Sequence, residues 1–121
     1  MNKWNKVGLW IAIILVALYV GAGGGFKLAG NPHVHAGFAV MGLPGWFGYF
    51  IGACEVLAAV GLFVRPFSAL AAGGIAPIMV GALYYHLAYT PPATKALPAL
   101  VLLLLCIYIF LLRRADMLKF K

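Results

Sequence analysis

The chain has 121 residues, of which 65% are hydrophobic and only 9% are charged, and its mean hydropathy is +1.04. Soluble domains carry charge on about a quarter of their residues, so this composition excludes an ordinary soluble globular protein. The formal net charge of +7 does not indicate a nucleic-acid partner. The lysines and arginines stand at the edges of apolar runs, where they anchor helices at a membrane surface.

Long apolar runs follow one another along the chain and predict an all-α fold. A run of about 18 residues or more is what the roughly 30 Å hydrocarbon core of a bilayer requires. Inside that core each segment must satisfy its own backbone hydrogen bonds, which favours helices. We therefore predict a single transmembrane domain over residues 1–121, an integral membrane four-helix bundle in a lipid bilayer, with spans at about 7–25, 46–64, 67–89 and 96–112.

The first span also resembles a signal peptide, with a basic start and glycines at its end, but its apolar run is long for a signal core. Between the first two spans, Asn31 and Pro32 are typical of a helix start, and Phe38 and Met41 continue an apolar face. We predict a short interfacial helix at about 32–41, because about ten residues cannot cross a bilayer. In the third span, the ring of Pro77 predicts a kink.

The distribution of basic residues predicts the orientation. With four spans, one side holds both termini and the 65–66 turn, and the other side holds Lys27 and Lys95. The first side carries seven lysines and arginines: Lys3, Lys6, Arg65, Arg113, Arg114, Lys119 and Lys121. The excess of positive charge on cytoplasmic loops therefore predicts a multi-pass protein of the cell membrane with both termini in the cytoplasm.

Glu55 is the acidic residue inside an apolar run, near the middle of the second predicted span. Gly48, Gly52, Glu55 and Ala59 recur at i, i+4, i+7 and i+11, which predicts that Glu55 points into the bundle along a stripe of small residues. Because no basic residue lies inside a span to pair with it, we expect Glu55 to be mainly protonated at neutral pH. Its role is open between a ligand-contacting or proton-accepting carboxyl and a neutral carboxyl bonded for packing.

The remaining polar candidates lie towards the predicted outer side. His86 shares a helix end with Tyr85, and Lys27 follows the first span. We interpret Lys27, Glu55, Tyr85 and His86 as a candidate ligand-binding pocket, a polar funnel that opens outward with Glu55 at its base. No metal site is expected, because His33 and His35 at i, i+2 do not share a helical face, and both are interpreted as solvated interfacial residues. Cys54 and Cys106 are interpreted as small buried apolar residues.

The stretch from Gly21 through Leu87 resembles the DoxX-like family of small four-span membrane proteins. The resemblance rests on segments in the family's order: Gly24-Gly25-Phe26-Lys27-Leu28, Leu43-Pro44, Ile51-Gly52-Ala53-Cys54-Glu55, Gly61-Leu62, and Met79-Val80-Gly81-Ala82 followed by His86. It implies a four-helix bundle. Some members of that family are associated with quinone-linked oxidoreductase complexes, and distant relatives act in membrane-protein assembly.

Three functions follow as hypotheses. The first is a redox-linked subunit that binds a quinone, a lipid or another lipophilic small molecule, with an oxidoreductase subunit as partner and no covalently bound cofactor. The alternative is a non-enzymatic assembly or partner-binding protein, which includes self-association. A transporter of protons or small solutes is less favoured, because 121 residues show no inverted repeat. The sequence leaves open whether the protein is an enzyme.

Overall fold

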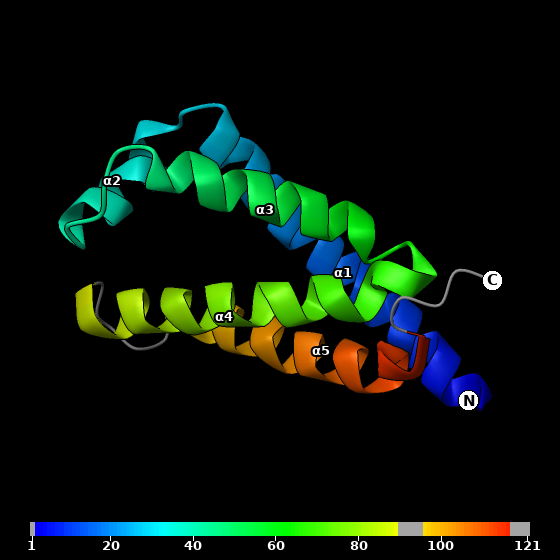
Figure 1. The fold of residues 1–121 in the computed structure, drawn as a ribbon. Coiled ribbons are helices and arrows are strands. Elements are labelled where there is room, and N and C mark those ends of the chain that lie inside the picture. The colour runs from blue at the N-terminus through cyan, green and yellow to red at the C-terminus, as the bar shows by residue number, and fades with distance from the viewer. Residues whose placement is uncertain (1, 90–95, 117–121) are drawn as a thin grey trace.

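The computed structural model describes residues 2–89 and 96–116, and the regular elements in this part of the chain are helices (Figure 1). In chain order they are α1 (Lys3–Leu28), α2 (Pro32–Val40), α3 (Phe47–Gly61), α4 (Arg65–Tyr89), α5 (Leu97–Arg113) and a short 3-10 helix, η2 (Arg114–Asp116). Four long helices and one short helix between the first two agree with the predicted order. The predicted bounds differ from the observed ones by up to four residues.

Capping explains where α1 begins and where α1 and α2 end. The side chain of Asn2 accepts a hydrogen bond from the amide of Asn5 at 2.7 Å, which satisfies one of the free donors at the start of α1. Each helix ends in a Schellman motif whose glycine has a positive φ, 78° at Gly30 after α1 and 77° at Gly42 after α2. α1 is longer than predicted at both ends, because it begins at Lys3 rather than at residue 7 and continues to Leu28 rather than to residue 25.

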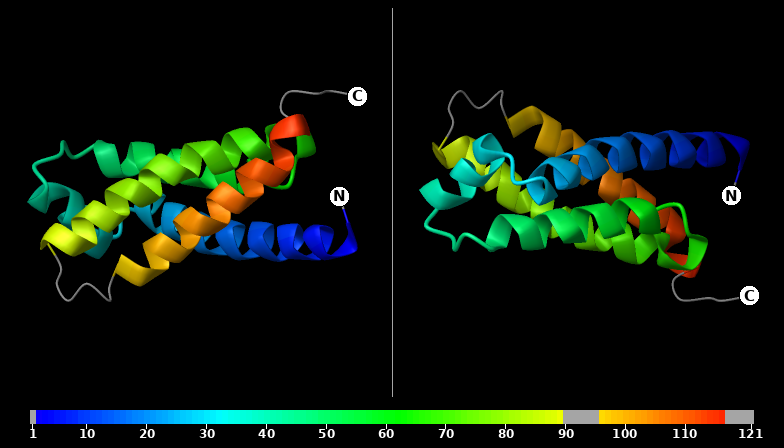
Figure 2. Two further views of the ribbon diagram at one scale, coloured as in Figure 1. Left: turned by 90° about the horizontal axis from the view of Figure 1, so that it is seen from below. Right: turned by 90° about the horizontal axis from the view of Figure 1, so that it is seen from above.

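The long helices form two antiparallel pairs (Figures 1 and 2). α1 packs along α3, α4 packs along α5, and the two pairs meet through smaller contacts of α3 with α4 and of α1 with α5. One end of the bundle, called the basic end below, holds the start of α1, the turn between α3 and α4, and the end of α5. The opposite end, called the α2 end below, holds α2, which lies near the end of α4 at Tyr89.

The core is a continuous set of apolar side chains contributed by all four long helices. Its fully buried members include Leu9, Ile13, Val16, Val20, Leu62, Ile75, Cys106 and Ile109. Large apolar side chains also point outward from each long helix, for example Leu18, Leu57, Val80 and Leu104, each more than half exposed. An apolar exterior on this scale marks a surface that is made for something other than water.

Two of the described helices, α1 and α4, are long and apolar enough to cross a membrane, and the apolar helices α3 and α5 are shorter. α3 ends at Gly61 rather than at residue 64, because the chain needs residues 62–64 to turn back into α4. α4 is continuous through Pro77. The kink at this proline stays a prediction.

Arg113 was interpreted as an anchor at the edge of the last span, and its side chain lies further inside the bundle than that. It is only 6% exposed, and its guanidinium carbon lies 5.5 Å from the centroid of the Trp10 ring. A guanidinium at this distance from an indole face is attracted by the ring quadrupole. The contact ties the end of α5 to the first turns of α1.

Candidate functional site

The buried face of α3 organises the polar residues of the bundle. Its buried residues are Gly48, Gly52, Glu55 and Ala59, the stripe that the sequence predicts, and Glu55 is 3% exposed. The prediction that Glu55 points into the bundle is therefore confirmed. Each small residue of this face leaves room for a group that another helix contributes.

The backbones of α1 and α3 approach each other closely at Gly24 and Gly52. A Cβ added to Gly24 would lie 2.8 Å from the carbonyl oxygen of Gly52, and one added to Gly52 would lie 2.9 Å from the carbonyl oxygen of Gly24. Real Cβ atoms are not found so close to backbone, so both positions need glycine. On the same face, a Cβ added to Gly21 would lie 3.5 Å from the Cβ of Ala59. A Cβ added to Gly25 would have no neighbour within 4 Å.

Lys27 and Glu55 form an ion pair inside this contact. The distance between Lys27 Nζ and Glu55 Oε1 is 2.7 Å, and the two side chains are 15% and 4% exposed. The sequence-based expectation that Glu55 has no basic partner, and is neutral for that reason, is wrong in its premise.

Two features of α1 and α3 explain how Lys27 reaches Glu55. The extended α1 keeps Lys27 within the helix, on the side that faces α3. Gly52 then lets the lysine stem cross α3, since a Cβ on Gly52 would lie 2.7 Å from the Cβ of Lys27. The stem carries the ammonium group about one turn further, to Glu55. Removal of either partner would leave the other charge buried without compensation.

His35 was interpreted as a solvated residue, and its ring is instead partly buried against α1 and α3. Its Nε2 donates a hydrogen bond to the carbonyl oxygen of Lys27 at 2.8 Å, which caps the last turn of α1. The ring fills the space that Gly48 leaves, where a Cβ would overlap Nδ1 of His35. It also lies on the ring of Tyr49, with centroids 4.4 Å apart. The contact between His35 and Gly48 is tertiary, and no pattern in the sequence around His35 predicts this role.

Tyr85 and His86 lie near the end of α4, with ring centroids 5.3 Å apart. The Tyr85 hydroxyl reaches α2, where it would lie 3.0 Å from a Cβ added to Gly37. The structure therefore brings Lys27 and Glu55 into direct contact and places Tyr85 and His86 side by side on α4. Tyr85 also links the end of α4 to α2.

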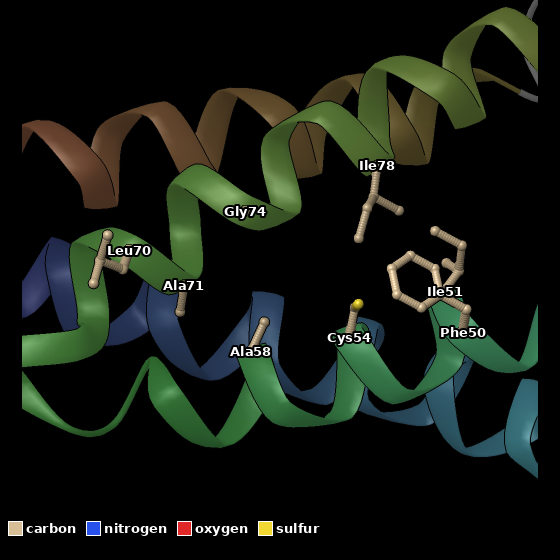
Figure 3. A pocket seen from close by; sticks show the side chains of 8 residues that line it. All are labelled: Phe50, Ile51, Cys54, Ala58, Leu70, Ala71, Gly74 and Ile78. Carbon is tan, nitrogen blue, oxygen red and sulfur yellow. The ribbon is translucent and has the colours of Figure 1, made fainter.

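An apolar groove of about 310 Å³ lies between α3 and α4 (Figure 3). Its floor holds Ala71, which is buried, and its rim holds Phe50 and Leu70, which are 53% and 45% exposed. The residues of the candidate pocket do not line it, although Glu55 directly follows one of its members. The lining residues are Phe50, Ile51, Cys54, Ala58, Leu70, Ala71, Gly74 and Ile78.

Among the residues that the structure describes, no group of three or more histidine, cysteine, aspartate or glutamate side chains is placed to hold a metal ion. His33 is in α2, and its side chain lies outside the described part of the structure. The chemistry that the described residues offer is thus a buried ion pair, a histidine that caps α1, and an apolar groove beside them.

The comparisons with known proteins agree with the fold. The model of the DoxX-like family matches residues 11–108, which covers α2, α3 and α4 and most of α1 and α5. No curated protein and no solved structure matches the chain. The match includes the ion pair, His35 and every residue that lines the groove.

Proposed function

Because this chain belongs to the DoxX-like family, whose membership supports a small membrane protein, we propose that it is a four-span protein of the cell membrane that binds a lipophilic small molecule of the quinone class. In this proposal it is a redox-linked subunit that presents the bound molecule to an oxidoreductase partner. The observation that carries the proposal is the apolar groove between α3 and α4.

The position of the groove favours a ligand that arrives from the bilayer. Its rim is formed by exposed apolar side chains on the outer surface of two membrane helices, so a molecule dissolved in the lipid can enter from the side. A volume of about 310 Å³ lies at the lower end of the range for ligand pockets and suits one substituted ring. An isoprenoid tail can remain in the surrounding lipid.

The polar end of such a ligand has hydrogen-bond donors within reach of the same helices. Ile78 and Tyr85 are seven residues apart on α4, so Tyr85 continues the groove-facing side two turns towards the α2 end. A tyrosine hydroxyl and a histidine ring nitrogen are donors that suit a quinone carbonyl. We therefore assign Tyr85 and His86 to the polar end of the ligand, and Lys27 and Glu55 to the wall that α1 and α3 form behind it.

Four spans with cytoplasmic termini are part of the proposal. Outward-pointing apolar side chains occur on α3 and α5 as well as on α1 and α4, which supports lipid around all four helices. The shorter helices extend about 23–26 Å at 1.5 Å per residue, and their flanking turns add to that length. Of the described basic residues, five lie at the basic end and Lys27 lies towards the α2 end, which supports a cytoplasmic basic end.

A pair of leucine substitutions on α4 tests the groove. Gly74 is an exposed helical glycine that lines the groove and has no neighbour within 4 Å of an added Cβ. Val80 is 53% exposed, does not line the groove, and lies about 120° around the helix from Gly74. Leucine is a better helix former than glycine or valine. Gly74→Leu should fill the groove, and Val80→Leu should leave the groove unchanged.

The measurement is equilibrium binding of a short-chain ubiquinone analogue to the protein in lipid nanodiscs. We expect Gly74→Leu to weaken binding about tenfold or more, and Val80→Leu to bind as the unchanged protein does. Absence of saturable binding to the unchanged protein would overturn the proposal, as would equal binding by the two variants.

A further inference from the structure

We propose that α2 is a hinged cap over the Lys27–Glu55 ion pair, that His35 is its latch, and that opening of the cap admits water and small polar solutes to the pair from the α2 end. The proposal goes beyond the groove and its ligand, because it concerns the neighbouring, buried face of α3 and the α2 end of the bundle. It rests on three independent observations.

The first observation is the order of groups along the buried face of α3. Counted from the α2 end, Gly48 is covered by the ring of His35, Gly52 by the stem of Lys27, and Glu55 by the lysine ammonium. Gly48 and Glu55 are seven residues apart, so the imidazole lies about two turns outward of the carboxylate on the same face. The ring thus closes the path that leads along this face to the pair.

The second observation is that few of the described side chains of α2 hold it against the long helices. None of its described side chains is fully buried, in contrast to each long helix. His35 donates to the Lys27 carbonyl oxygen at 2.8 Å, and Phe38 packs edge-on against Phe47 with centroids 5.6 Å apart. Gly37 touches the hydroxyl of Tyr85. Segments with few buried apolar contacts open at lower free energy than the core.

The third observation is a glycine with positive φ on each side of α2, Gly30 and Gly42. Glycine populates this region and its neighbours with little strain, so both connections can change φ and ψ when α2 moves. The two ends of the segment are therefore suited to act as hinges, with α2 moving as a short rigid helix between them.

Lys27 joins the latch to the pair. Its carbonyl oxygen accepts the hydrogen bond of His35, and its ammonium group binds Glu55. When His35 leaves, the last turn of α1 loses a cap and the lysine stem loses the ring that lies outward of it. Release of α2 therefore exposes the same residue that neutralises the carboxylate.

The accessibility of Glu55 to a water-soluble carbodiimide with glycine ethyl ester tests the cap. The chain contains two acidic residues, Glu55 and Asp116, so mass spectrometry of peptides assigns the label without ambiguity. In nanodiscs, His35→Ala should raise the rate of Glu55 labelling about three- to tenfold, the factor that one net hydrogen bond represents. His35→Gln can donate to the same carbonyl and should restore part of the protection. Val40→Ala, an exposed position on α2, should leave the rate unchanged.

A glycine pair tests the hinge. Gly42 and Gly45 both have no neighbour within 4 Å of an added Cβ, but only Gly42 has a positive φ. Gly42→Ala strains the closed position of α2 and should raise the labelling rate about fivefold or more, whereas Gly45→Ala should not. Labelling of Cys106, which is 0% exposed, by an apolar maleimide serves as the control for general loosening and should stay unchanged in every variant.

Equal labelling of Glu55 in the unchanged protein, His35→Ala and Gly42→Ala would overturn the cap. A rise in Gly45→Ala that matches the rise in Gly42→Ala, or a parallel rise at Cys106, would overturn it as well. These measurements use no quinone, so their outcome is distinct from success or failure of the binding test with Gly74→Leu.

Discussion

Lys27 of α1 and Glu55 of α3 are joined by a contact of 2.7 Å between Nζ and Oε1, and the two side chains are among the least exposed charged groups of the described structure. The pair lies where two glycines let the helix backbones approach, so charge and close packing occur at the same place. Removal of either charge leaves the other in an apolar contact that was shaped around both.

We expect Lys27→Met to destabilise the protein by about 3 kcal/mol or more, because it leaves the Glu55 carboxylate buried without its partner. The double variant Lys27→Met, Glu55→Leu should recover most of that loss, since an apolar pair has no desolvation cost. Thermal unfolding in detergent, evaluated as a double-mutant cycle, measures the coupling. Additive losses in the double variant would show that the contact contributes no coupling energy.

Adjacent glycines of α1 offer a test of the close helix approach. Gly24→Ala should destabilise the bundle by about 1–3 kcal/mol, because the new Cβ would lie 2.8 Å from the Gly52 carbonyl oxygen and the backbones must separate. Gly25→Ala has no neighbour within 4 Å and should be neutral or slightly stabilising. Melting temperatures of the two variants decide the matter, and similar values would contradict the packing described here.

The contact between Trp10 and Arg113 predicts a difference between two tryptophans. Trp10→Leu should lower stability by about 0.5–2 kcal/mol through loss of the cation–π contact, and Trp4→Leu, at a position 77% exposed, should have little effect. Chemical unfolding of both variants in the same detergent gives the comparison. An equal effect of both substitutions would assign the loss to general hydrophobicity instead.

The proposed orientation predicts which single cysteines react with an impermeant thiol reagent in intact cells. In a background with Cys54→Ala and Cys106→Ala, a cysteine in place of Gly45 should be labelled from outside. A cysteine in place of Asn2 should react only after the membrane is opened, because five of the described basic residues share its end. The reverse pattern would invert the topology.

The sequence was sufficient for the helix order and for the buried face of α3, because both depend on periodicity. Gly48, Gly52, Glu55 and Ala59 could be placed together from their spacing alone. The partner of Glu55 could not, since it depends on how far α1 extends and on how closely α1 crosses α3. The same holds for His35, which meets Gly48 across a turn of the chain and shows no local pattern for that contact.

Sequence reasoning drew the candidate pocket from polar residues and did not predict the apolar groove between α3 and α4. Polar residues stand out in an apolar chain, so they attract attention first. The groove arises from the divergence of α3 and α4 and from small residues such as Ala58 and Gly74, which leave space without any chemical signature. Only the packing of the two helix pairs could reveal it.

In the proposed four-span topology, the ion pair between α1 and α3 has a consequence for the biogenesis of the protein. On insertion scales, a charged side chain at the centre of a helix costs about 3 kcal/mol, and α3 is short, so the carboxylate of Glu55 opposes the entry of this segment into the bilayer. α1 is synthesised first and carries the neutralising ammonium near its end. A nascent α3 that meets α1 at the translocon can therefore insert as half of a hairpin. The order of synthesis then contributes to the insertion of α3.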